Sequence, residues 1–151
     1  MPPSPVPQGW WGEVGAVLID GGLELLDQAE CLRLLASQHV GRVGVSVGSL
    51  PAIFPVNYAV DGDQVLFRTG EGTKLAVAVS GAVVAFETDW FDSFSHEGWS
   101  VLVVGRAEVV PEGDDKARVR AWAPGERDRL VSIRAELVSG RRIRHDVDEQ
   151  R

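Results

Sequence analysis

Several residue types are scarce in this chain of 151 residues, and each scarcity excludes a class of protein. Cys31 is the only cysteine, so a disulfide framework and a cysteine-based metal site are both excluded. Basic residues number 15 against 22 acidic ones, which gives a formal net charge of -7. Broad binding to nucleic acid or to an acidic membrane surface requires a positive field, so we expect neither.

Long apolar runs and metal-ligand patterns are also missing. No apolar run approaches the roughly 20 residues that cross a bilayer, and the N-terminal stretch lacks the positive and apolar regions of a secretory signal. We therefore expect a cytoplasmic protein. His39, His96 and His145 lie on a predicted helix end, a loop and a tail, without the spacing of metal ligands. No serine lies in a nucleophile-elbow context, so serine hydrolysis is not predicted either.

The residues that are present suit one domain. Hydrophobic residues make up 44% of the chain, an ordinary share for a globular protein, and the length allows a real core. Residues 1–23 are rich in Pro and Gly and predict a flexible arm. The domain itself is expected over residues 24–145, followed by a polar tail at 146–151.

Hydrophobic periodicity predicts a mainly β fold with short helices. Residues 26–38 read as a helix that Asp27 caps, with Glu30 as its reciprocal partner. Gly105, inside a long strand, indicates a bulge or a barrel corner. Further helices are predicted at 73–80 and 112–122, and strands at 40–47, 52–60, 64–67, 82–90, 99–110 and 129–143.

Six strands joined by close turn signals, such as the hairpin signal "DGD" at 61–63, favour an antiparallel barrel with short helices over its ends. The side chains of so small a barrel fill its interior. We therefore expect a ligand to bind on the outside of the barrel or at a subunit interface.

The segment at 67–74, "FRTGEGTK", places Arg68 and Lys74 around two glycines in an otherwise acidic chain. It lies between a predicted strand and a predicted helix. A phosphate-binding loop at a helix start is one interpretation, because glycines admit a close approach and cations attract phosphate. A solvated polar connection is the other, since the spacing does not match the Walker motif. The residues alone leave both open.

A family resemblance bears on this choice. The stretch "PVNYAVDGDQVLFRTGEGTKL" at 55–75, followed by "GAVVAFETD", "GWSVLVVGRAEVV" and "AWAPGERDRLVSI", resembles the pyridoxamine 5'-phosphate oxidase-like FMN-binding split-barrel family, in particular its small actinobacterial members. The resemblance covers about residues 24–143. It implies a six-stranded antiparallel split β-barrel, and a homodimer that binds FMN, or in some branches the deazaflavin F420, at the subunit interface.

The resemblance also implies which residues bind the cofactor. A strand segment would run along the edge of the isoalloxazine ring, and the segment that follows would take the phosphate. Arg68 and Lys74 would form the charged clamp there, with Thr69 and Thr73 as hydroxyl donors. The second subunit would contribute near Trp99 and Trp122. The full expected set is Pro55, Val56, Asn57, Tyr58, Phe67, Arg68, Thr69, Thr73, Lys74, Trp99, Ser100 and Trp122.

Three functions stay open at this stage. The first is an FMN-dependent oxidoreductase that transfers two electrons to a small planar substrate, with the cofactor supplying the chemistry and no catalytic residue assigned. The second is an F420-dependent reductase, whose longer anionic tail would need a basic groove around Arg141, Arg142 and Arg144. The third is a non-catalytic flavin- or haem-binding protein. The C-terminal "RIRHD" matches the substrate signature of true pyridoxamine phosphate oxidases only loosely, so that substrate is not predicted.

Overall fold

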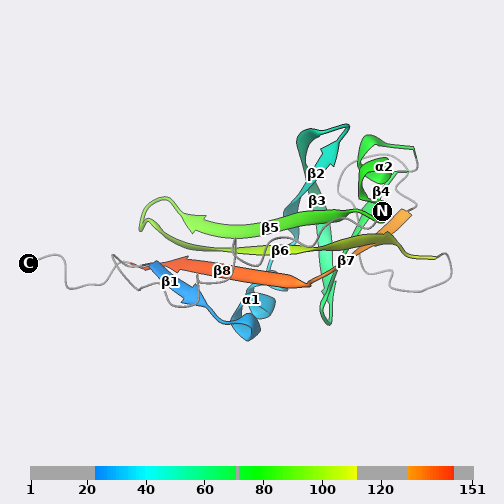
Figure 1. Ribbon diagram of the computed structural model, residues 1–151. Coiled ribbons are helices and arrows are strands. Elements are labelled where there is room, and N and C mark those ends of the chain that lie inside the picture. The colour runs from blue at the N-terminus through cyan, green and yellow to red at the C-terminus, as the bar shows by residue number, and fades with distance from the viewer. Residues whose placement is uncertain (1–22, 71, 112–128, 145–151) are drawn as a thin grey trace, which may run out of the picture.

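The computed structural model describes residues 23–70, 72–111 and 129–144, which form eight strands and two helices (Figure 1). The predicted helix at 112–122, with Trp122, lies outside the described residues. In chain order the elements are β1 (Leu23–Leu26), α1 (Gln28–Leu35), β2 (Val40–Val47), β3 (Leu50–Asp61), β4 (Gln64–Thr69), α2 (Lys74–Val79), β5 (Val83–Asp92), β6 (Glu97–Val109), β7 (Arg129–Arg134) and β8 (Leu137–Ile143).

Six of these strands close into an antiparallel barrel. The pairing runs β6–β5–β2–β3–β4–β7, and β7 pairs again with β6 to complete the ring. The strand β8 pairs with β6 on the same edge as β7 but nearer the start of β6, and β1 pairs with β8, so that β5, β6, β8 and β1 lie side by side in Figure 1. The six-stranded barrel predicted from the sequence is confirmed.

The single strand predicted at 129–143 is wrong, because the structure divides it into β7 and β8. The break falls at Ala135 and Glu136, where the Glu136 amide donates to the Arg134 carbonyl oxygen at 2.9 Å. Before the break the chain pairs with β4 and the far end of β6, and after it with the near end of β6. The strand β1 was not predicted either, since four residues are too few to show a period.

The corner of the barrel lies at Gly105, as the sequence predicts. Here β6 changes partner, from Leu137 of β8 opposite Val104 to Ile133 of β7 opposite Ala107. A β-carbon on Gly105 would lie 1.6 Å from the Arg134 carbonyl oxygen, so only glycine fits. The predicted hairpin turn is also found, because Gly62 adopts a φ of 60° between Asp61 and its cross-strand partner Gln64, as a type II′ turn requires.

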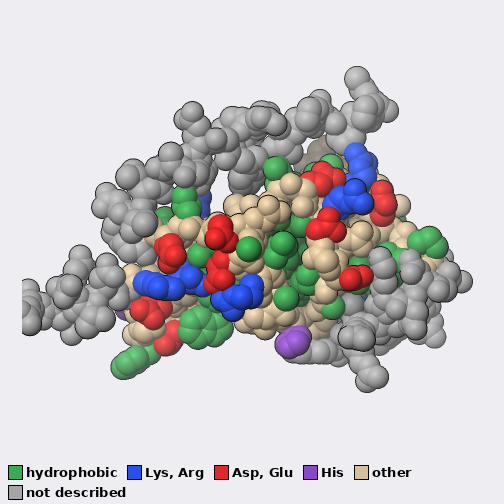
Figure 2. Space-filling model, turned by 90° about the horizontal axis from the view of Figure 1, so that it is seen from below, with side chains coloured by type: hydrophobic (Ala, Val, Ile, Leu, Met, Phe, Trp, Pro, Cys, Tyr) green, Lys and Arg blue, Asp and Glu red, His purple; other side chains and the backbone are tan. Residues whose placement is uncertain are grey.

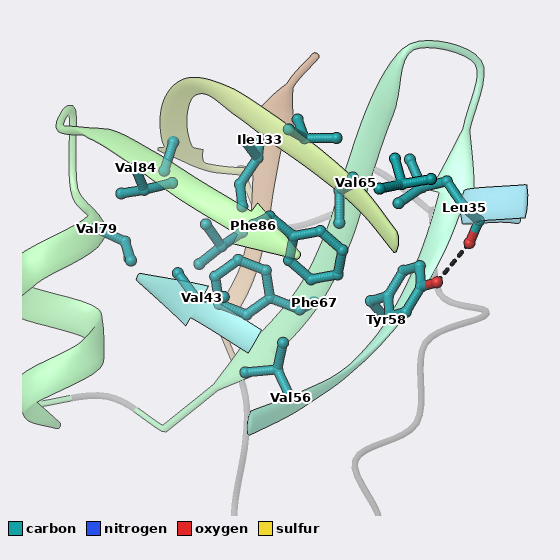
Figure 3. Packing of buried hydrophobic residues seen from close by; sticks show 14 of the residues in the cluster. Leu35, Val43, Val56, Tyr58, Val65, Phe67, Val79, Val84, Phe86 and Ile133 are labelled. Carbon is teal, nitrogen blue, oxygen red and sulfur yellow. Dashed lines mark hydrogen bonds between the residues drawn. The ribbon is translucent and has the colours of Figure 1, made fainter. Parts of the chain in front are cut away.

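The barrel interior is filled by side chains from all six strands and from α1. Phe67 and Phe86 are fully buried, and the ring of Tyr58 meets that of Phe86 edge to face, with centroids 4.8 Å apart (Figure 3). The Tyr58 hydroxyl donates a hydrogen bond to the carbonyl oxygen of Leu35, which ties the end of α1 to the barrel. The interior is thus occupied, as expected of a small barrel.

The start of α1 depends on Asp27, whose carboxylate accepts the backbone N–H of Glu30 at 2.8 Å. Replacing Asp27 with alanine should lower the free energy of unfolding by about 1 kcal/mol, because an amide at the helix start loses its acceptor. Asp27→Asn keeps an oxygen there and should retain most of that stability. Urea denaturation of both variants tests this, and an unchanged midpoint for Asp27→Ala would contradict it.

Candidate functional site

The connection between β4 and α2 is a tight turn held by two threonines. The Thr73 hydroxyl caps α2 by accepting the Ala76 amide at 3.1 Å, and it donates to the Gly70 carbonyl oxygen at 2.9 Å. The oxygen of the buried Thr69 hydroxyl lies 3.0 Å from the hydroxyl oxygen of Thr73, and Thr69 must be the donor, because the Thr73 proton is already used. Both hydroxyl protons therefore stay inside the protein, and the expected phosphate contacts of Thr69 and Thr73 stay a prediction.

This arrangement makes Thr73 the centre of the turn. Thr73→Val keeps the shape of the side chain but removes all three hydrogen bonds, so it should lower the free energy of unfolding by about 1–2 kcal/mol. Thr73→Ser keeps the hydroxyl and serves as the matched control. Denaturation curves compare the two variants, and equal losses of stability in both would show that the hydroxyl does not hold the turn.

Strand alternation divides the other expected site residues between the two sides of the barrel wall. Val56, Tyr58 and Phe67 are buried on the inner side (Figure 3). Thr69 is buried as well and has the same parity as Phe67 on β4. Their neighbours along the two strands point outward instead; they are Pro55, Asn57 and Arg68. Only these outward side chains can touch a ligand on the outside of the barrel, while the buried ones fix the strands that carry them.

The outward residues lie close to one another across the sheet. The register that pairs Tyr58 with Phe67 places Asn57 opposite Arg68 when it is continued by one residue. On its other side Arg68 is opposite Leu130 of β7. Arg68 is half-buried, and Lys74 is exposed at the first position of α2, just beyond the threonine turn. The guanidinium of Arg68 and the amide of Asn57 thus lie before the β4–α2 turn, and the ammonium of Lys74 lies after it.

Trp99 and Ser100 lie elsewhere, on β6. Trp99 is only 8% exposed and stands opposite Trp90 of β5, whereas Ser100 faces outward between Asp89 and Arg141. Ser100 is separated from Asn57 by three inter-strand steps, which is about 14 Å. One chain therefore does not bring these two residues into direct contact with the β3–β4 group.

A charged cluster that the sequence did not reveal lies between these two groups. The guanidinium of Arg42 on β2 is 3.3 Å from a carboxylate oxygen of Glu87 and 3.2 Å from one of Asp89, both on β5. The pKa of Glu87 is raised to about 7. Burial of the carboxyl is the largest cause and the neighbouring Asp89 carboxylate is the next, while Arg42 acts in the opposite direction. Alternation along the two strands places these three side chains on the outward side of the barrel. That pattern predicts a charged cluster only once the pairing of β2 with β5 is known.

The cluster lies on what we call the broad face, the outward surface of β3, β2, β5, β6 and β8. One cross-strand row spans it, in the order Ile53, Gly44, Ala85, Val104 and Leu137. Nine large apolar side chains of the described residues are exposed, and five of them belong to this face: Ile53, Val83, Phe91, Leu137 and Ile143. Apolar side chains also reach the surface between acidic and basic groups in the view of Figure 2.

The arginines near the C-terminal end of β8 are largely occupied by carboxylates. Arg142 is 2.7 Å from Glu30 and 3.9 Å from Glu24, and Arg144 is 3.6 Å from Glu24. The hydrogen bonds from Arg33 and Arg142 hold the pKa of Glu30 at about 2. These ion pairs fasten β1 and α1 to β8, so the basic patch seen in the sequence is mostly neutralised.

Residues 23–70, 72–111 and 129–144 contain neither a candidate metal centre nor a membrane-spanning helix. No group of three or more histidine, cysteine, aspartate or glutamate side chains in these ranges could hold a metal ion. None of the helices in the same ranges is long and apolar enough to cross a membrane.

Comparison with known proteins identifies the family. A family model described as pyridoxamine 5'-phosphate oxidase matches residues 27–142, from the start of α1 to the end of β8. The chain belongs to this family. The resemblance seen in the sequence is thereby confirmed, and so is the split-barrel fold that it implied.

Members and neighbours of the family cover most of the chain. An uncharacterised protein of Mycobacterium tuberculosis is 41% identical over 127 residues, which are 78% of this chain and 84% of that protein. An FAD-binding protein from Mycobacterium smegmatis has a TM-score of 0.66 at 36% identity, covering 81% of this chain and 99% of that one. An FAD-binding protein from Mesorhizobium loti has a TM-score of 0.68 at 25% identity, covering 82% and 98%.

Proposed function

We propose that this protein binds a flavin on the outside of its barrel and transfers two electrons between that flavin and a small planar substrate. The observation that carries the proposal is the placement of Arg68 and Lys74 on either side of the Thr69–Thr73 turn, in a chain of net charge -7. Relatives described as FAD-binding, at 36% and 25% identity, support a flavin as the ligand.

The donor groups at this turn fit the phosphate of a flavin nucleotide. A guanidinium and an ammonium give charge-assisted hydrogen bonds to phosphate oxygens, and they need no proton transfer to do so. Asn57, beside Arg68 on the outward side of β3, has an amide that suits the polar edge of an isoalloxazine ring. A bound flavin would supply the two-electron chemistry, while these residues bind and orient it.

FMN is the cofactor we expect, and FAD must be tested beside it, because both share the ring, the ribityl chain and the first phosphate. F420 is the alternative. Its longer anionic tail would need a basic groove, and Arg142 and Arg144 already pair with Glu24 and Glu30. The ion pairs are our reason for preferring FMN or FAD.

The site is proposed to be shared between two copies of the chain. A ring on the outside of a small barrel needs a second surface to exclude water from it. Trp99, Ser100 and Trp122 of the second copy are the residues that we expect to supply this surface. The distance of Ser100 from Asn57 within one chain is in keeping with such an arrangement.

The absorption spectrum of the purified protein, followed by mass analysis of the released chromophore, tests the flavin proposal. We expect the visible bands of a bound flavin and the mass of FMN or FAD. Protein stripped of its chromophore should bind FMN and FAD again in a fluorescence titration. A colourless protein that takes up neither of them would contradict the proposal.

Electron transfer needs a separate measurement. The bound flavin is reduced without oxygen and mixed with small planar acceptors such as quinones, and its reoxidation is followed by absorbance. A faster reaction than that of free reduced flavin would support an oxidoreductase. A rate no faster than that of free flavin for every acceptor would leave a flavin-binding protein.

A further inference from the structure

The surface around Ser100 carries an arginine whose charge no neighbouring carboxylate balances. Arg141 of β8 is exposed and lies opposite Ser100 on one side and Leu25 of β1 on the other. Its outward neighbours along β8 are Ser139 and Ile143, which carry no charge either. Among the residues that the structure describes, no carboxylate lies within ion-pair distance of the Arg141 guanidinium.

The charged groups nearest to Arg141 are paired with other residues. The arginines at positions 142 and 144 contact carboxylates of β1 and α1. Asp89, two strands away beyond Ser100, lies 3.2 Å from Arg42 instead. In a chain with 22 acidic and 15 basic residues, the Arg141 guanidinium thus keeps its planar set of N–H donors for an acid group from outside the chain.

An exposed aromatic ring lies in the next outward row of the same sheet. Phe91 of β5 is opposite Gly98 of β6, which precedes Ser100 by two residues, and Phe91 is 55% exposed. A β-carbon on Gly98 would lie 2.3 Å from Cδ1 of the Phe91 ring, so the ring rests directly against the Gly98 backbone. Glycine at position 98 therefore makes room for the ring.

The hairpin end that follows Phe91 is held by its own hydrogen bonds. The Asp92 carboxylate accepts the Phe94 amide at 2.9 Å and the Ser95 hydroxyl at 3.0 Å, and these two bonds lower the pKa of Asp92. The His96 amide donates to the Asp92 carbonyl oxygen at 2.9 Å. Phe91 is thus presented on a structured hairpin rather than on a loose loop.

We propose that Arg141 and Phe91 of the second copy bind the substrate beside the flavin, and that this substrate is a planar aromatic acid. The acid group binds the guanidinium, and the aromatic ring packs against Phe91. This inference rests on the proposed function, in which Ser100 of the second copy lies at the flavin. It goes beyond that function because it names the substrate class and the residues that select it.

The spacing of the two side chains suits a small acid. Arg141 and Phe91 are separated by two inter-strand steps and by two residues along the strands, which is about 12 Å between their α-carbons. Ser100 lies between them. One or two fused six-membered rings with an acid group fit this interval. In Figure 1 the β5–β6 hairpin and the C-terminal end of β8 lie at the opposite end of the molecule from α2, so the second copy must supply this surface.

Calorimetric titration of the flavin-bound protein with 2-naphthoate tests the recognition without a redox reaction. The wild type should bind 2-naphthoate at least about tenfold more tightly than the neutral 2-naphthamide, because only the acid makes a charge-assisted hydrogen bond. Arg141→Gln should remove this preference. Arg134→Gln is the matched control, since Arg134 is exposed at the end of β7 and its loss changes the net charge equally.

Two results would overturn the acid site. One is a wild type that binds the acid no more tightly than the amide. The other is a preference in Arg141→Gln that equals the preference in Arg134→Gln.

The aromatic contact is tested with the same two probes. Phe91→Ala should weaken the binding of both by about two- to tenfold, the effect of losing an aromatic pair. Phe94→Ala is the control, because Phe94 is 95% exposed on the same hairpin but lies outside the row of Phe91. Phe91→Leu, which keeps apolar bulk without the ring, gives a second measure of the contact. Unchanged affinity in both Phe91 variants would contradict this part of the proposal.

Reoxidation of the reduced, flavin-bound protein tests the substrate class during turnover. Both 1,4-naphthoquinone and its 2-sulfonate take up two electrons and two protons from reduced flavin. The ratio of the rate for the sulfonate to the rate for the neutral quinone should fall at least about tenfold from wild type to Arg141→Gln. The same ratio in both proteins would overturn the proposal.

Failure of this inference can be told apart from failure of the proposed function. A protein that takes up no flavin would contradict the proposed function itself. A protein that binds flavin and reduces neutral quinones faster than free flavin does, without any preference for acids, would contradict only the substrate class.

Discussion

Gly105→Ala should destabilise the protein more than any other single methyl addition proposed here, by at least about 3 kcal/mol. The added β-carbon would lie 1.6 Å from the Arg134 carbonyl oxygen, and that oxygen belongs to backbone rather than to a flexible side chain. Relief of the clash requires β6 and β7 to separate at the corner where the ring of strands closes. We expect little folded protein, or a strongly reduced denaturation midpoint.

Gly44→Ala is the matched control, because a β-carbon there would meet the side chain of Ala85 at an ordinary 3.6 Å. Its free energy of unfolding should stay within about 1 kcal/mol of the wild type. Circular dichroism during urea denaturation compares the two variants. If Gly105→Ala were as stable as Gly44→Ala, the barrel would not close through the contact described here.

Arg68→Ala and Lys74→Ala should each weaken flavin binding by about 1.5–3 kcal/mol, which is roughly a tenfold to hundredfold rise in the dissociation constant. Both cations border the β4–α2 turn, where we expect the flavin phosphate. Titration of flavin-free protein with FMN and with FAD gives the dissociation constants. Unchanged affinity in both variants would mean that the phosphate does not bind at this turn.

Arg134→Ala serves as the control for charge, since its exposed side chain lies at the other end of β7 and its loss changes the net charge equally. Riboflavin sharpens the comparison because it has the ring but no phosphate. The two clamp variants should bind riboflavin as the wild type does. A parallel loss of riboflavin and FMN affinity would indicate damage to the fold rather than a missing phosphate contact.

Most of the fold could be predicted because local patterns agree with the final structure. The alternation of Val43, Val45 and Val47, the turn around Gly62 and the cap at Asp27 depend on neighbouring residues only. Gly105 was informative because a corner leaves no room for a side chain. The division between β7 and β8 was missed, since Ala135 and Glu136 carry no turn signal and the break depends on which part of β6 each segment meets.

Less of the candidate site than of the fold could be predicted from the sequence. The composition of residues 67–74 allowed a phosphate site but favoured a solvated polar loop until the family resemblance was added. Alternation already implied that Arg68 and Phe67 face opposite sides, but the use of the Thr69 and Thr73 hydroxyls inside the turn needed coordinates. The cluster around Arg42 could not be foreseen, because it joins residues 45 and 47 positions apart.

Native mass spectrometry of the purified protein tests whether two copies share the flavin site, because it counts chains and flavins in the same particle. We expect a species of two chains, each of 16.3 kDa, that carries two flavin molecules. Under the same conditions, Lys74→Ala should give a two-chain species with less flavin. A single chain that retains one flavin, or a two-chain species that never carries any, would contradict a flavin site shared between two copies.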